Sequence, residues 1–492
     1  MSFAHGAALG GGSAGGAGAG AGAGAPGDRL VRVFNHWLSP RKAAFFLAEE
    51  AVLVAALLAG ASLGPVAVQA AGADQPVMGA VIRAAVASLF FAGALYLGDL
   101  YDVGAAVRDR GDGRRLLRAI GIAAIAMALA DVVLHPFLPS WMLHHSLVVS
   151  AAGGAVGVIT ARALLPAMLG APTPVLFLGT GPRARDVARA LEREAQGLYR
   201  AVGFVRPERA VAPPAVPESQ VLEGSVADVA RRLRAQIVVV AMEDRREGLP
   251  VNDLLSLRTR GRRVVDDVGF AEATLQRIPL SLVRPSALIF DDGFRVSRAT
   301  RTAKRALDLA ASTALLLVTG PLMAVVAAVI LLCDGRPVFY SQERTGRGGS
   351  RYRIWKFRTM RRDAERLGAA WATDADPRVL PIGRFLRRAR LDELPQLWNV
   401  LCGDMSLVGP RPEREVFLSE LKVRWPLFTL RELVKPGLTG WAQLKYGYGS
   451  TLEEQGKKLE YDLYYIKNAS LFLDLVCLLA TAKVVLLGKG AR

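Results

Sequence analysis

Long apolar segments alternate with short polar stretches over the first third of this 492-residue chain. Each apolar segment is close to the roughly 20 residues that an α-helix needs to cross a bilayer. The pattern predicts a membrane α-helical bundle over residues 43–165, with four transmembrane helices at 43–63, 77–97, 119–138 and 143–165.

Basic residues mark alternate ends of these segments. Arginine and lysine precede the first segment, fill the loop between the second and third, and return with Arg162 near the end of the fourth. The other two connections, 64–76 and 139–142, carry none. Because cytoplasmic loops hold the excess of basic residues, the pattern places the N-terminus and everything after residue 165 in the cytoplasm. The alternative, a buried helical bundle in a soluble protein, does not require this asymmetry.

The apolar segments also contain charged residues, Glu49, Glu50, Arg83 and Asp131. An ionisable group inside a membrane is a candidate functional site. Arg83 can extend toward the interface and the two glutamates lie near a segment end, so a role in packing the bundle is expected. Residues 1–27 are a Gly/Ala-rich tail that is expected to be disordered and lacks the continuous apolar core of a signal peptide.

Short apolar runs alternate with helical patterns in residues 174–270. The runs at Val175–Leu178, Ala201–Val205, Ile237–Ala241 and Arg263–Val265 predict a Rossmann-like α/β unit with a parallel sheet.

The nucleotide fingerprint of that domain is incomplete. Gly179 and Gly181 follow the first strand, and Ala184 stands at the third glycine position, which the fingerprint tolerates. The second strand ends in Arg206-Pro207, where a ribose-binding acid is expected. The sequence therefore favours a degenerate Rossmann-like domain with a structural, oligomerising or regulatory role over one that binds a dinucleotide.

Residues 271–303 read as a mixed linker. The apolar segment that follows, 304–332, is long enough to cross a membrane but is interrupted at Gly320-Pro321. Proline removes one backbone hydrogen bond of a helix and kinks it. A kinked apolar helix ahead of the C-terminal domain, 333–492, is therefore predicted.

The composition of the chain indicates which classes of partner it can bind. Hydrophobic residues make up 52% of the chain and the net charge is +18, which predicts an anionic partner such as phospholipid headgroups or a phosphorylated substrate. The basic residues are spread among apolar helices and no nucleic-acid motif is present, so we expect no nucleic acid. The three cysteines, Cys333, Cys402 and Cys477, are too far apart in sequence to indicate a metal site or a disulfide.

Candidate chemistry is concentrated between residues 387 and 412. Asp392 and Glu393 follow a run of arginines and precede Pro395, which predicts that both carboxylates lie at a helix N-terminus. The helix dipole and the arginines favour the ionised carboxylates there. Carboxylates for Mg²⁺ together with guanidinium groups for phosphate oxygens suit phosphoryl transfer. The alternative is a helix cap with solvated charges.

Three other cations accompany the carboxylate pair. Lys356 and Arg358 bracket Phe357 in a strand-like run, so both should point to one face and could meet a diphosphate or a lipid phosphate. Arg411 lies between two prolines that restrict its backbone and limit the entropy lost when it binds an anion.

The C-terminal half resembles the bacterial sugar transferases, also called monotopic phosphoglycosyl transferases or polyprenyl-phosphate hexose-1-phosphate transferases. The resemblance rests on eight motifs in order: K-R-A-L-D-L, P-V-F-Y-S-Q-E-R-T-G, Y-R-I-W-K-F-R-T-M, D-P-R-V, L-D-E-L-P-Q, M-S-L-V-G-P-R-P, V-K-P-G-L-T-G-W-A-Q and Y-D-L-Y-Y-I-K-N. The segments Y-G-Y-G-S and G-K-G-A-R look most like the long-form exopolysaccharide and exosortase-associated subgroup.

For the fold, this resemblance implies a re-entrant membrane helix over 304–332, with its structural break at Pro321. That helix enters and leaves the same leaflet. The C-terminal domain, 333–492, would then be an α/β catalytic domain with interfacial helices on the cytoplasmic face of the bacterial inner membrane. Membrane lipids are expected partners, together with a second copy of the chain in a homo-oligomer such as a dimer.

For the activity, the resemblance implies transfer of hexose 1-phosphate from a UDP-hexose, with glucose or galactose as the hexose, to undecaprenyl phosphate. UMP is released, and the reaction initiates exopolysaccharide or a related surface glycan. Asp392 is expected to form a covalent phosphosugar intermediate. Glu393 holds Mg²⁺, together with Asp392, or orients the site; the sequence leaves both roles open.

The resemblance implies that Arg387 and Arg411 bind substrate phosphate, and the strand pattern predicts the same role for Lys356 and Arg358. The Gly-rich stretch from Lys435 to Gln443 is expected to form a loop on the nucleotide side of the site; the alternative is a folded turn with a buried Trp441.

Two other classes of function remain as alternatives. A membrane-anchored nucleotide-sugar dehydratase or epimerase predicts bound NAD and a helical Tyr-x-x-x-Lys, but Tyr352 and Lys356 lie in a strand-like run. A non-catalytic scaffold for polysaccharide export predicts a decayed C-terminal half, yet the carboxylate pair and the Pro-Arg-Pro turn are intact.

Overall fold

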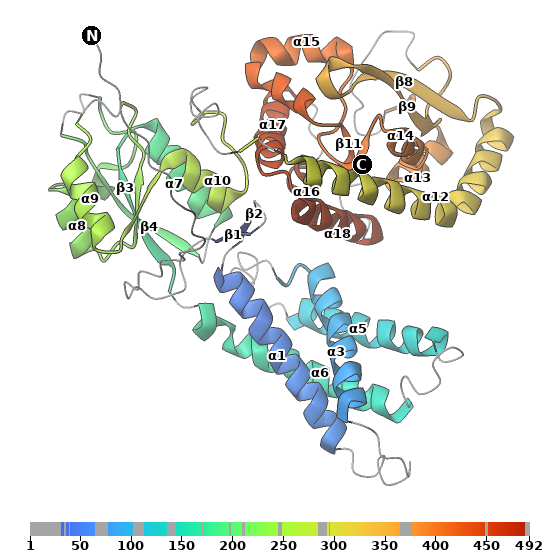
Figure 1. The fold of residues 1–492 in the computed structure, drawn as a ribbon, viewed down its shortest axis with the longest axis horizontal. Helices are drawn as coiled ribbons and strands as arrows, with labels where there is room; N and C mark the ends of the chain where they lie inside the picture. The colour runs from blue at the N-terminus through green and yellow to red at the C-terminus, as the bar shows by residue number, and fades with distance from the viewer. Residues whose placement is uncertain are drawn as a thin grey trace, which may run out of the picture.

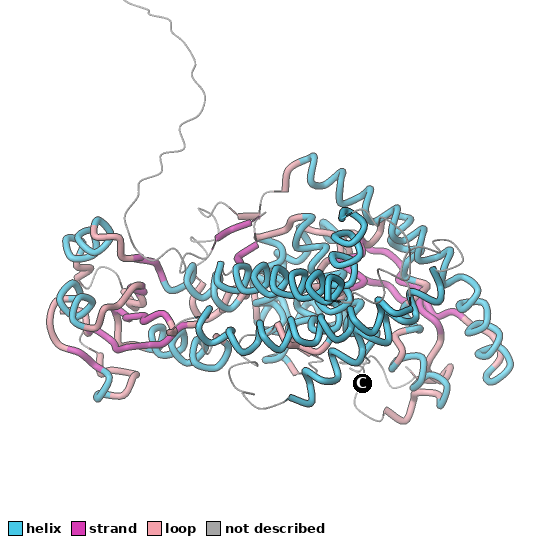
Figure 2. Tube along the Cα trace, turned by 90° about the horizontal axis from the view of Figure 1, so that it is seen from below, coloured by secondary structure: helices cyan, strands magenta, loops and turns pink. Residues whose placement is uncertain are grey.

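The computed structural model describes residues 31–33, 36–38, 40–63, 77–101, 113–134, 144–169, 171–195, 198–208, 212–244, 248–283, 293–294, 296–364, 376–447 and 451–487. Within them, a helical bundle, a domain around a parallel sheet and a larger C-terminal domain follow one another along the chain (Figure 1). Helices make up most of the described chain (Figure 2). The predicted tail, 1–27, lies outside the described residues.

The N-terminal bundle contains four long helices near the predicted positions, preceded by a two-stranded ribbon of β1 (Val31–Val33) and β2 (His36–Leu38). The helices are α1 (Pro40–Leu63), α3 (Val77–Leu97), α5 (Gly113–Leu134) and α6 (His144–Leu169). Glycines let α6 approach α1 closely, because a Cβ atom at Gly157 would lie 3.1 Å from the Leu53 Cα.

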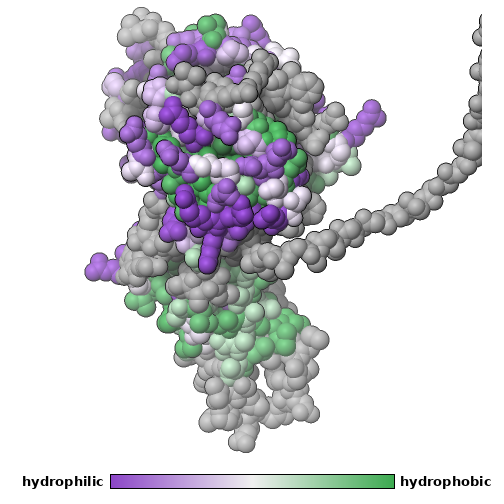
Figure 3. All heavy atoms as spheres, turned by 90° about the vertical axis from the view of Figure 1, so that its left-hand side faces the viewer, coloured by the Kyte–Doolittle hydropathy of each residue, from purple (hydrophilic) through white to green (hydrophobic). Residues whose placement is uncertain are grey.

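The surface of this bundle is apolar. Figure 3 shows hydrophobic side chains over the described part of the bundle and mainly hydrophilic ones over the sheet domain. By length and composition, one helix among the described residues, α12 (Arg298–Asp334), qualifies as able to cross a membrane. The four-helix bundle is therefore present, whereas its insertion in a membrane stays a prediction.

A buried charge in the bundle is paired. The Glu49 carboxylate lies 2.9 Å from Arg162 Nε, and Arg162 also donates to the Leu100 carbonyl. The Arg162 guanidinium lies over the rings of Phe45 and Tyr101. Glu49 thus contributes to packing between α1 and α6, as expected from the sequence.

The second domain has a five-stranded parallel sheet in the order β5-β4-β3-β6-β7, which matches the first five positions of the Rossmann strand order 3-2-1-4-5-6. The four predicted strands are confirmed. The strands are β3 (Thr173–Leu178), β4 (Tyr199–Val205), β5 (Val221–Leu222), β6 (Ile237–Val240) and β7 (Arg263–Asp266). β5 was not predicted because two residues carry no pattern.

Helices cover both faces of this sheet and give each face its own apolar core. One core involves α7 (Pro182–Glu194) and α10 (Asp267–Leu275), and the other involves α8 (Val226–Arg232) and α9 (Val251–Thr259). The predicted domain boundary at residue 270 falls inside α10, because this helix continues the apolar pattern to Leu275.

A carboxylate of the domain itself occupies the start of α7. The Arg183 backbone N–H donates to Glu243 Oε1 at 2.9 Å. A dinucleotide phosphate binds at this helix N-terminus in Rossmann folds. The Ala215 N–H also donates to the Thr180 carbonyl, so another segment lies against the glycine turn. Both contacts accord with a degenerate Rossmann-like domain.

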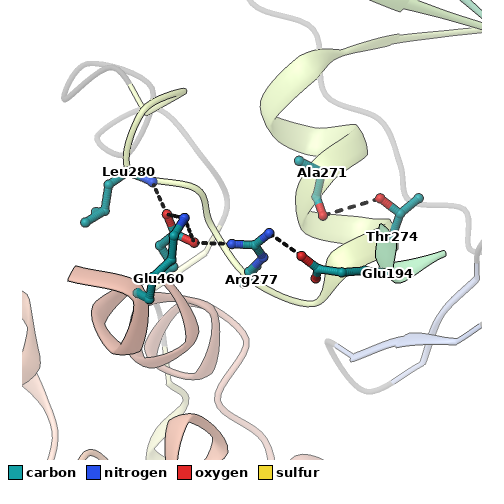
Figure 4. A network of polar contacts seen from close by, with 7 residues as sticks. Glu194, Ala271, Thr274, Arg277, Leu280 and Glu460 are labelled. Carbon is teal, nitrogen blue, oxygen red and sulfur yellow. Dashed lines mark hydrogen bonds and ion pairs between the residues drawn. The ribbon is translucent and has the colours of Figure 1, made fainter. Parts of the chain in front are cut away.

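The sheet domain contacts the C-terminal domain through buried ion pairs. Arg277 lies between Glu194 of α7, at 2.6 Å, and Glu460 of α17 (Leu452–Lys467), at 2.5 Å (Figure 4). Lys467 pairs with Glu272 of α10 at 2.5 Å. The first part of the predicted linker 271–303 therefore packs against the C-terminal domain.

The C-terminal domain combines short strands with helices. Its hairpin is β8 (Phe339–Thr345) and β9 (Arg351–Phe357), and its parallel pair is β10 (Ser406–Val408) and β11 (Gly437–Thr439). Its further helices are α13 (Pro381–Arg388), α14 (Gln396–Cys402), α15 (Glu415–Arg424), α16 (Trp441–Lys445) and α18 (Leu471–Leu487). Two 3₁₀ segments, η3 (Leu391–Glu393) and η4 (Pro426–Leu433), complete it.

Helix α12 begins six residues before the predicted position because Ser297 caps it, with its hydroxyl accepting the Thr300 N–H. In Figure 1 the helix changes direction part-way along its length. Pro321 lies inside it, and the Thr319 hydroxyl donates to the Leu315 carbonyl beside the break. Such a back-bond bends a helix, so a hydroxyl is present near the break although the Gly-Pro sequence itself has none.

Candidate functional site

The two carboxylates lie in a single 3₁₀ turn, η3, between α13 and α14. Arg390 precedes the turn in the left-handed region, with φ of 60°, which reverses the chain after α13. Asp392 and Glu393 are both buried. They lie just before α14 and not in its first turn, since Pro395 caps that helix.

Glu393 is held by two cations on the same oxygen. Lys356 Nζ lies 2.8 Å and Arg411 Nη2 lies 2.7 Å from Glu393 Oε1. Lys356 comes from β9 and Arg411 from the turn after β10, so three separate segments meet here. Burial favours a protonated carboxyl, but the two cations outweigh it and hold the pKa of Glu393 well below its usual range.

Asp392 differs from its neighbour in both contacts and basicity. Its buried carboxylate accepts no hydrogen bond from the other described residues. Burial and the adjacent Glu393 charge raise the pKa of Asp392, and Lys356, Arg387 and Arg411 offset only part of that rise. Asp392 is therefore the more basic carboxylate of the pair and the one whose oxygens remain available to react.

Arg387 also lies near the pair. Its Nε donates to the Thr359 hydroxyl at 3.0 Å, and its charge lowers the pKa of Asp392. The structure thus brings together Asp392, Glu393, Lys356, Arg387 and Arg411.

Two other predicted site residues have different surroundings. Arg358 donates to the carbonyls of Asp334 and Gly335 at the end of α12. Lys435 lies beside Gly403, at the opposite end of α14 from the carboxylate pair, and burial, followed by the Arg305 charge, lowers its pKa. Within the described chain, neither residue forms a hydrogen bond or ion pair with the carboxylate pair, and their substrate roles stay predictions.

Gln443 has an unusual environment. Its Oε1 is buried and has no hydrogen-bond partner among the described residues. An unsatisfied buried acceptor is uncommon in folded proteins. The predicted role of Gln443 on the nucleotide-side loop stays a prediction.

Sequence reasoning missed the residue that connects α14 to the hairpin. Asn399 accepts the Trp355 N–H at 3.0 Å and donates to the Arg353 carbonyl at 2.7 Å. These bonds fix the strand that carries Lys356 against the helix that follows the carboxylates. A polar residue inside the apolar run Leu397–Leu401 was the available signal.

The oxygens of the carboxylate pair fit a divalent cation. The Asp392 carboxylate and Glu393 Oε2 accept no hydrogen bond from the described residues, whereas Glu393 Oε1 accepts hydrogen bonds from both Lys356 and Arg411. Mg²⁺ is commonly held by one or two carboxylates together with substrate phosphates and water. Groups of three or more His, Cys, Asp or Glu with metal-binding geometry do not occur in the described chain. Two carboxylates plus substrate phosphate is thus the donor set that this site offers.

Comparison with known families gives one match in the C-terminal half. A family model described as bacterial sugar transferase matches residues 299–488, the region that contains α12 and every residue of the site.

Curated relatives cover the same region. The chain is 43% identical over 189 residues to a UDP-N-acetylgalactosamine-undecaprenyl-phosphate N-acetylgalactosaminephosphotransferase of Aeromonas hydrophila. These residues make up 38% of this chain and 45% of the relative. It is 31% identical over 327 residues to an undecaprenyl-phosphate glucose phosphotransferase of Komagataeibacter xylinus, with coverage of 64% and 60%.

A shorter relative is matched over most of its length. The uncharacterized sugar transferase EpsL of Bacillus subtilis strain 168 is 40% identical over 193 residues, which cover 38% of this chain and 90% of the relative. The chain thus spans only about half of the first relative but nearly all of this one.

Proposed function

The chain belongs to the bacterial sugar transferase family, and from this we propose that it transfers a sugar 1-phosphate from a UDP-sugar to undecaprenyl phosphate, with release of UMP. The reaction starts a glycan, such as an exopolysaccharide, on its lipid carrier. The different surroundings of Asp392 and Glu393 carry the proposal, because one carboxylate is held by cations and the other is available and more basic.

In the first step, an oxygen of Asp392 attacks the β-phosphorus of the UDP-sugar. The bond between that phosphorus and the bridging oxygen breaks, UMP leaves with the bridging oxygen, and an aspartyl phosphosugar forms. Arg411 and Lys356 hold Glu393 beside the reacting group, and Arg387 adds positive charge for the phosphate oxygens.

In the second step, an oxygen of undecaprenyl phosphate attacks the same phosphorus. The bond to Asp392 breaks, and the lipid diphosphate sugar leaves. Two steps suit two anionic substrates, because they never occupy the site together. Asp392 and Glu393 would hold Mg²⁺, which when bound neutralises charge on the diphosphate.

The re-entrant course of α12 is part of the proposal. Its first half is tied to the C-terminal domain by Lys304, which donates to the Val408 carbonyl and to Asp474. Its far end is held by Arg358 of the same domain. A helix with both ends on one domain re-enters the membrane and does not cross it. Apolar side chains are exposed along it, among them Leu317, Val318 and Leu332.

Membrane attachment involves the N-terminal bundle as well. Lys483 of α18 lies 2.6 Å from Asp99, which follows α3. This contact puts the C-terminal domain next to one end of the bundle. We infer an inner-membrane protein with several spans and a cytoplasmic active site.

UMP release by the purified protein tests this function. Wild type and Asp392→Asn are compared with UDP-glucose, UDP-galactose and UDP-N-acetylgalactosamine, each with Mg²⁺ and undecaprenyl phosphate. UDP-galactose is included because the sequence leaves glucose and galactose open, and UDP-N-acetylgalactosamine because one relative is named for that sugar. We expect release with one donor and none above background for Asp392→Asn.

A mass measurement tests the covalent step separately. Wild type incubated with the active donor but without lipid should gain the mass of one sugar phosphate on the peptide that contains Asp392. If Asp392→Asn turned over like wild type, the assignment of the nucleophile would be wrong. A folded protein that released no UMP from any donor would favour the scaffold alternative.

A further inference from the structure

A second arginine lies behind the Pro-Arg-Pro turn. Arg431, in η4, donates from Nη2 to the backbone carbonyl of Arg411 at 2.7 Å. It does not contact the carboxylate pair in the described structure; it contacts the backbone of the residue that does. The side chain of Arg411 reaches Glu393, while its carbonyl is held from the other side.

Three groups fix the position of Arg431. Its Nε lies 2.9 Å from Asp462 Oδ2, and the two side chains are only 10% and 3% exposed. The Phe428 ring packs against its guanidinium, 4.5 Å from the ring centroid. A planar guanidinium held by a carboxylate, an aromatic ring and a carbonyl has little freedom to reorient.

The turn itself needs this support. Pro410 and Pro412 restrict the chain on both sides of Arg411, because proline fixes its own φ and disfavours the α region for the residue before it. These restrictions limit the backbone conformations open to Arg411, but the direction of its carbonyl still depends on a hydrogen-bond donor. Arg431 supplies that donor, and the direction of the carbonyl determines where the Arg411 side chain leaves the turn.

We propose that Arg431 and Asp462 are positioning residues for the transfer, which set the backbone of Arg411 so that its guanidinium meets Glu393. This inference rests on the proposed function and adds to it two residues outside the predicted site. Asp462 belongs to the Y-D-L-Y-Y-I-K-N motif, and Arg431 follows Pro412 by nineteen positions.

Helix α17 offers a matched control. Asp462 and Glu460 lie on opposite faces of this helix, and each forms a buried ion pair with an arginine. Glu460 pairs with Arg277 of the sheet domain (Figure 4) and is not linked to Arg411 by any contact in the described chain. Glu460→Gln therefore removes a comparable ion pair from the same helix without touching the turn.

The kinetic experiment uses the full-length protein, the active donor and undecaprenyl phosphate. We expect Arg431→Gln and Asp462→Asn to lower kcat by about tenfold to a hundredfold, since a displacement of about 1 Å at a reacting group costs that much, while KM for the donor changes by less than about threefold. Arg431→Lys should recover part of the loss because it can still donate to the carbonyl. Glu460→Gln should keep kcat within about twofold of wild type.

A double-mutant cycle distinguishes positioning from general damage. In an Arg411→Lys background, adding Arg431→Gln should lower kcat by less than about twofold further, because Arg431 acts through Arg411. Full additivity, or an equal loss of kcat in Glu460→Gln, would overturn the inference. UMP release by wild type keeps the proposed function intact in either case.

A structure of the Arg431→Gln variant tests the inference without catalysis. We expect the Arg411 guanidinium to lose its contact with Glu393 Oε1. A variant that retained this contact would refute the positioning role, even if wild type released no UMP and the proposed function had failed.

Discussion

Two neighbouring carboxyl groups of the same turn acquire opposite properties from their contacts. Both are buried, which by itself raises the pKa of each. Glu393 receives two cations on one oxygen, and its pKa falls. Asp392 receives its neighbour's negative charge and stays the more basic. At the residue scale, the different pKa values and roles of Asp392 and Glu393 therefore depend on which carboxylate Lys356 and Arg411 contact.

Replacing Lys356, one of the two cations on Glu393, tests these different roles of the two carboxylates. Lys356→Gln should lower the rate of UMP release by about tenfold or more, since a hydrogen bond to a charged group contributes about 1.5–3 kcal/mol. Arg353→Gln changes an exposed cation on the same strand and serves as the control, with a rate within about twofold of wild type. Equal rates for Lys356→Gln and wild type would contradict the assigned contact.

The raised pKa of Asp462 predicts how the stability of the protein changes with pH. Burial raises the pKa of Asp462 to about 6, although Arg431 opposes the rise. The folded state therefore keeps this proton at pH values where the unfolded chain, with a pKa near 3.8, has lost it. Stability from this group is present below pH 3.8 and declines as pH rises to about 6, by about 3 kcal/mol in total.

Comparison with Asp462→Asn isolates this contribution. The variant lacks the ion pair at every pH. Its free energy of unfolding therefore differs from that of wild type by a constant amount and by the pH-dependent contribution of Asp462. We expect the stability of wild type relative to the variant to fall between pH 4 and pH 6, measured by thermal unfolding in detergent. A difference that rose over that range would contradict the direction of the shift.

At the scale of elements, α12 connects the membrane to the site. Asp308, which is buried, accepts the Leu407 N–H at 3.0 Å and the Ser406 hydroxyl, both in β10. Lys304 holds the end of the same strand through the Val408 carbonyl. Because β10 leads directly into the turn that carries Arg411, the first half of α12 fixes one side of the active site.

The two ends of α12 should be accessible from the same side of the membrane. Cys333 lies exposed near its far end, and Arg298→Cys introduces a thiol at its start. With Cys402 and Cys477 replaced by serine, a membrane-impermeant maleimide should label both positions from the cytoplasmic side of sealed vesicles. Labelling of the two positions from opposite sides would show that the helix crosses the membrane.

At the scale of the whole molecule, the sheet domain is tied to the C-terminal domain through buried charges. Glu272 accepts hydrogen bonds from Lys467 and from the Asn468 side chain, and all three residues are buried. The Trp441 indole donates to the Gln276 carbonyl across the same junction. Attraction within a buried ion pair is offset by desolvation, so such pairs fix the way two domains dock more than they add net stability.

Removing one partner of the Lys467–Glu272 ion pair should destabilise the protein. Lys467→Met leaves Glu272 buried without its cation and should lower the stability of the protein by about 3–5 kcal/mol. Replacing both residues by methionine removes the stranded charge, so the double variant should be closer to wild type in thermal unfolding. A double variant at least as unstable as Lys467→Met would contradict the importance of the buried ion pair.

The sequence by itself determined the elements, because their signals are local. Apolar segments of fixed length gave the four helices of the bundle, short apolar runs gave four of the five sheet strands, and the Pro-Arg-Pro turn and the adjacent Asp392 and Glu393 were visible as motifs. The predicted boundaries were wrong where a polar first turn extends a helix beyond its apolar pattern, as at the start of α12.

Only the tertiary structure decided which charges meet. Lys356 and Arg358 lie two positions apart and were expected to act together, yet one reaches Glu393 and the other the end of α12. Arg431 and Asp462 lie thirty-one positions apart and carry no joint pattern in the sequence. The reason is physical: a periodic pattern records which face of an element is buried, whereas the partner of a buried charge comes from another element whose approach is set by packing of the whole domain.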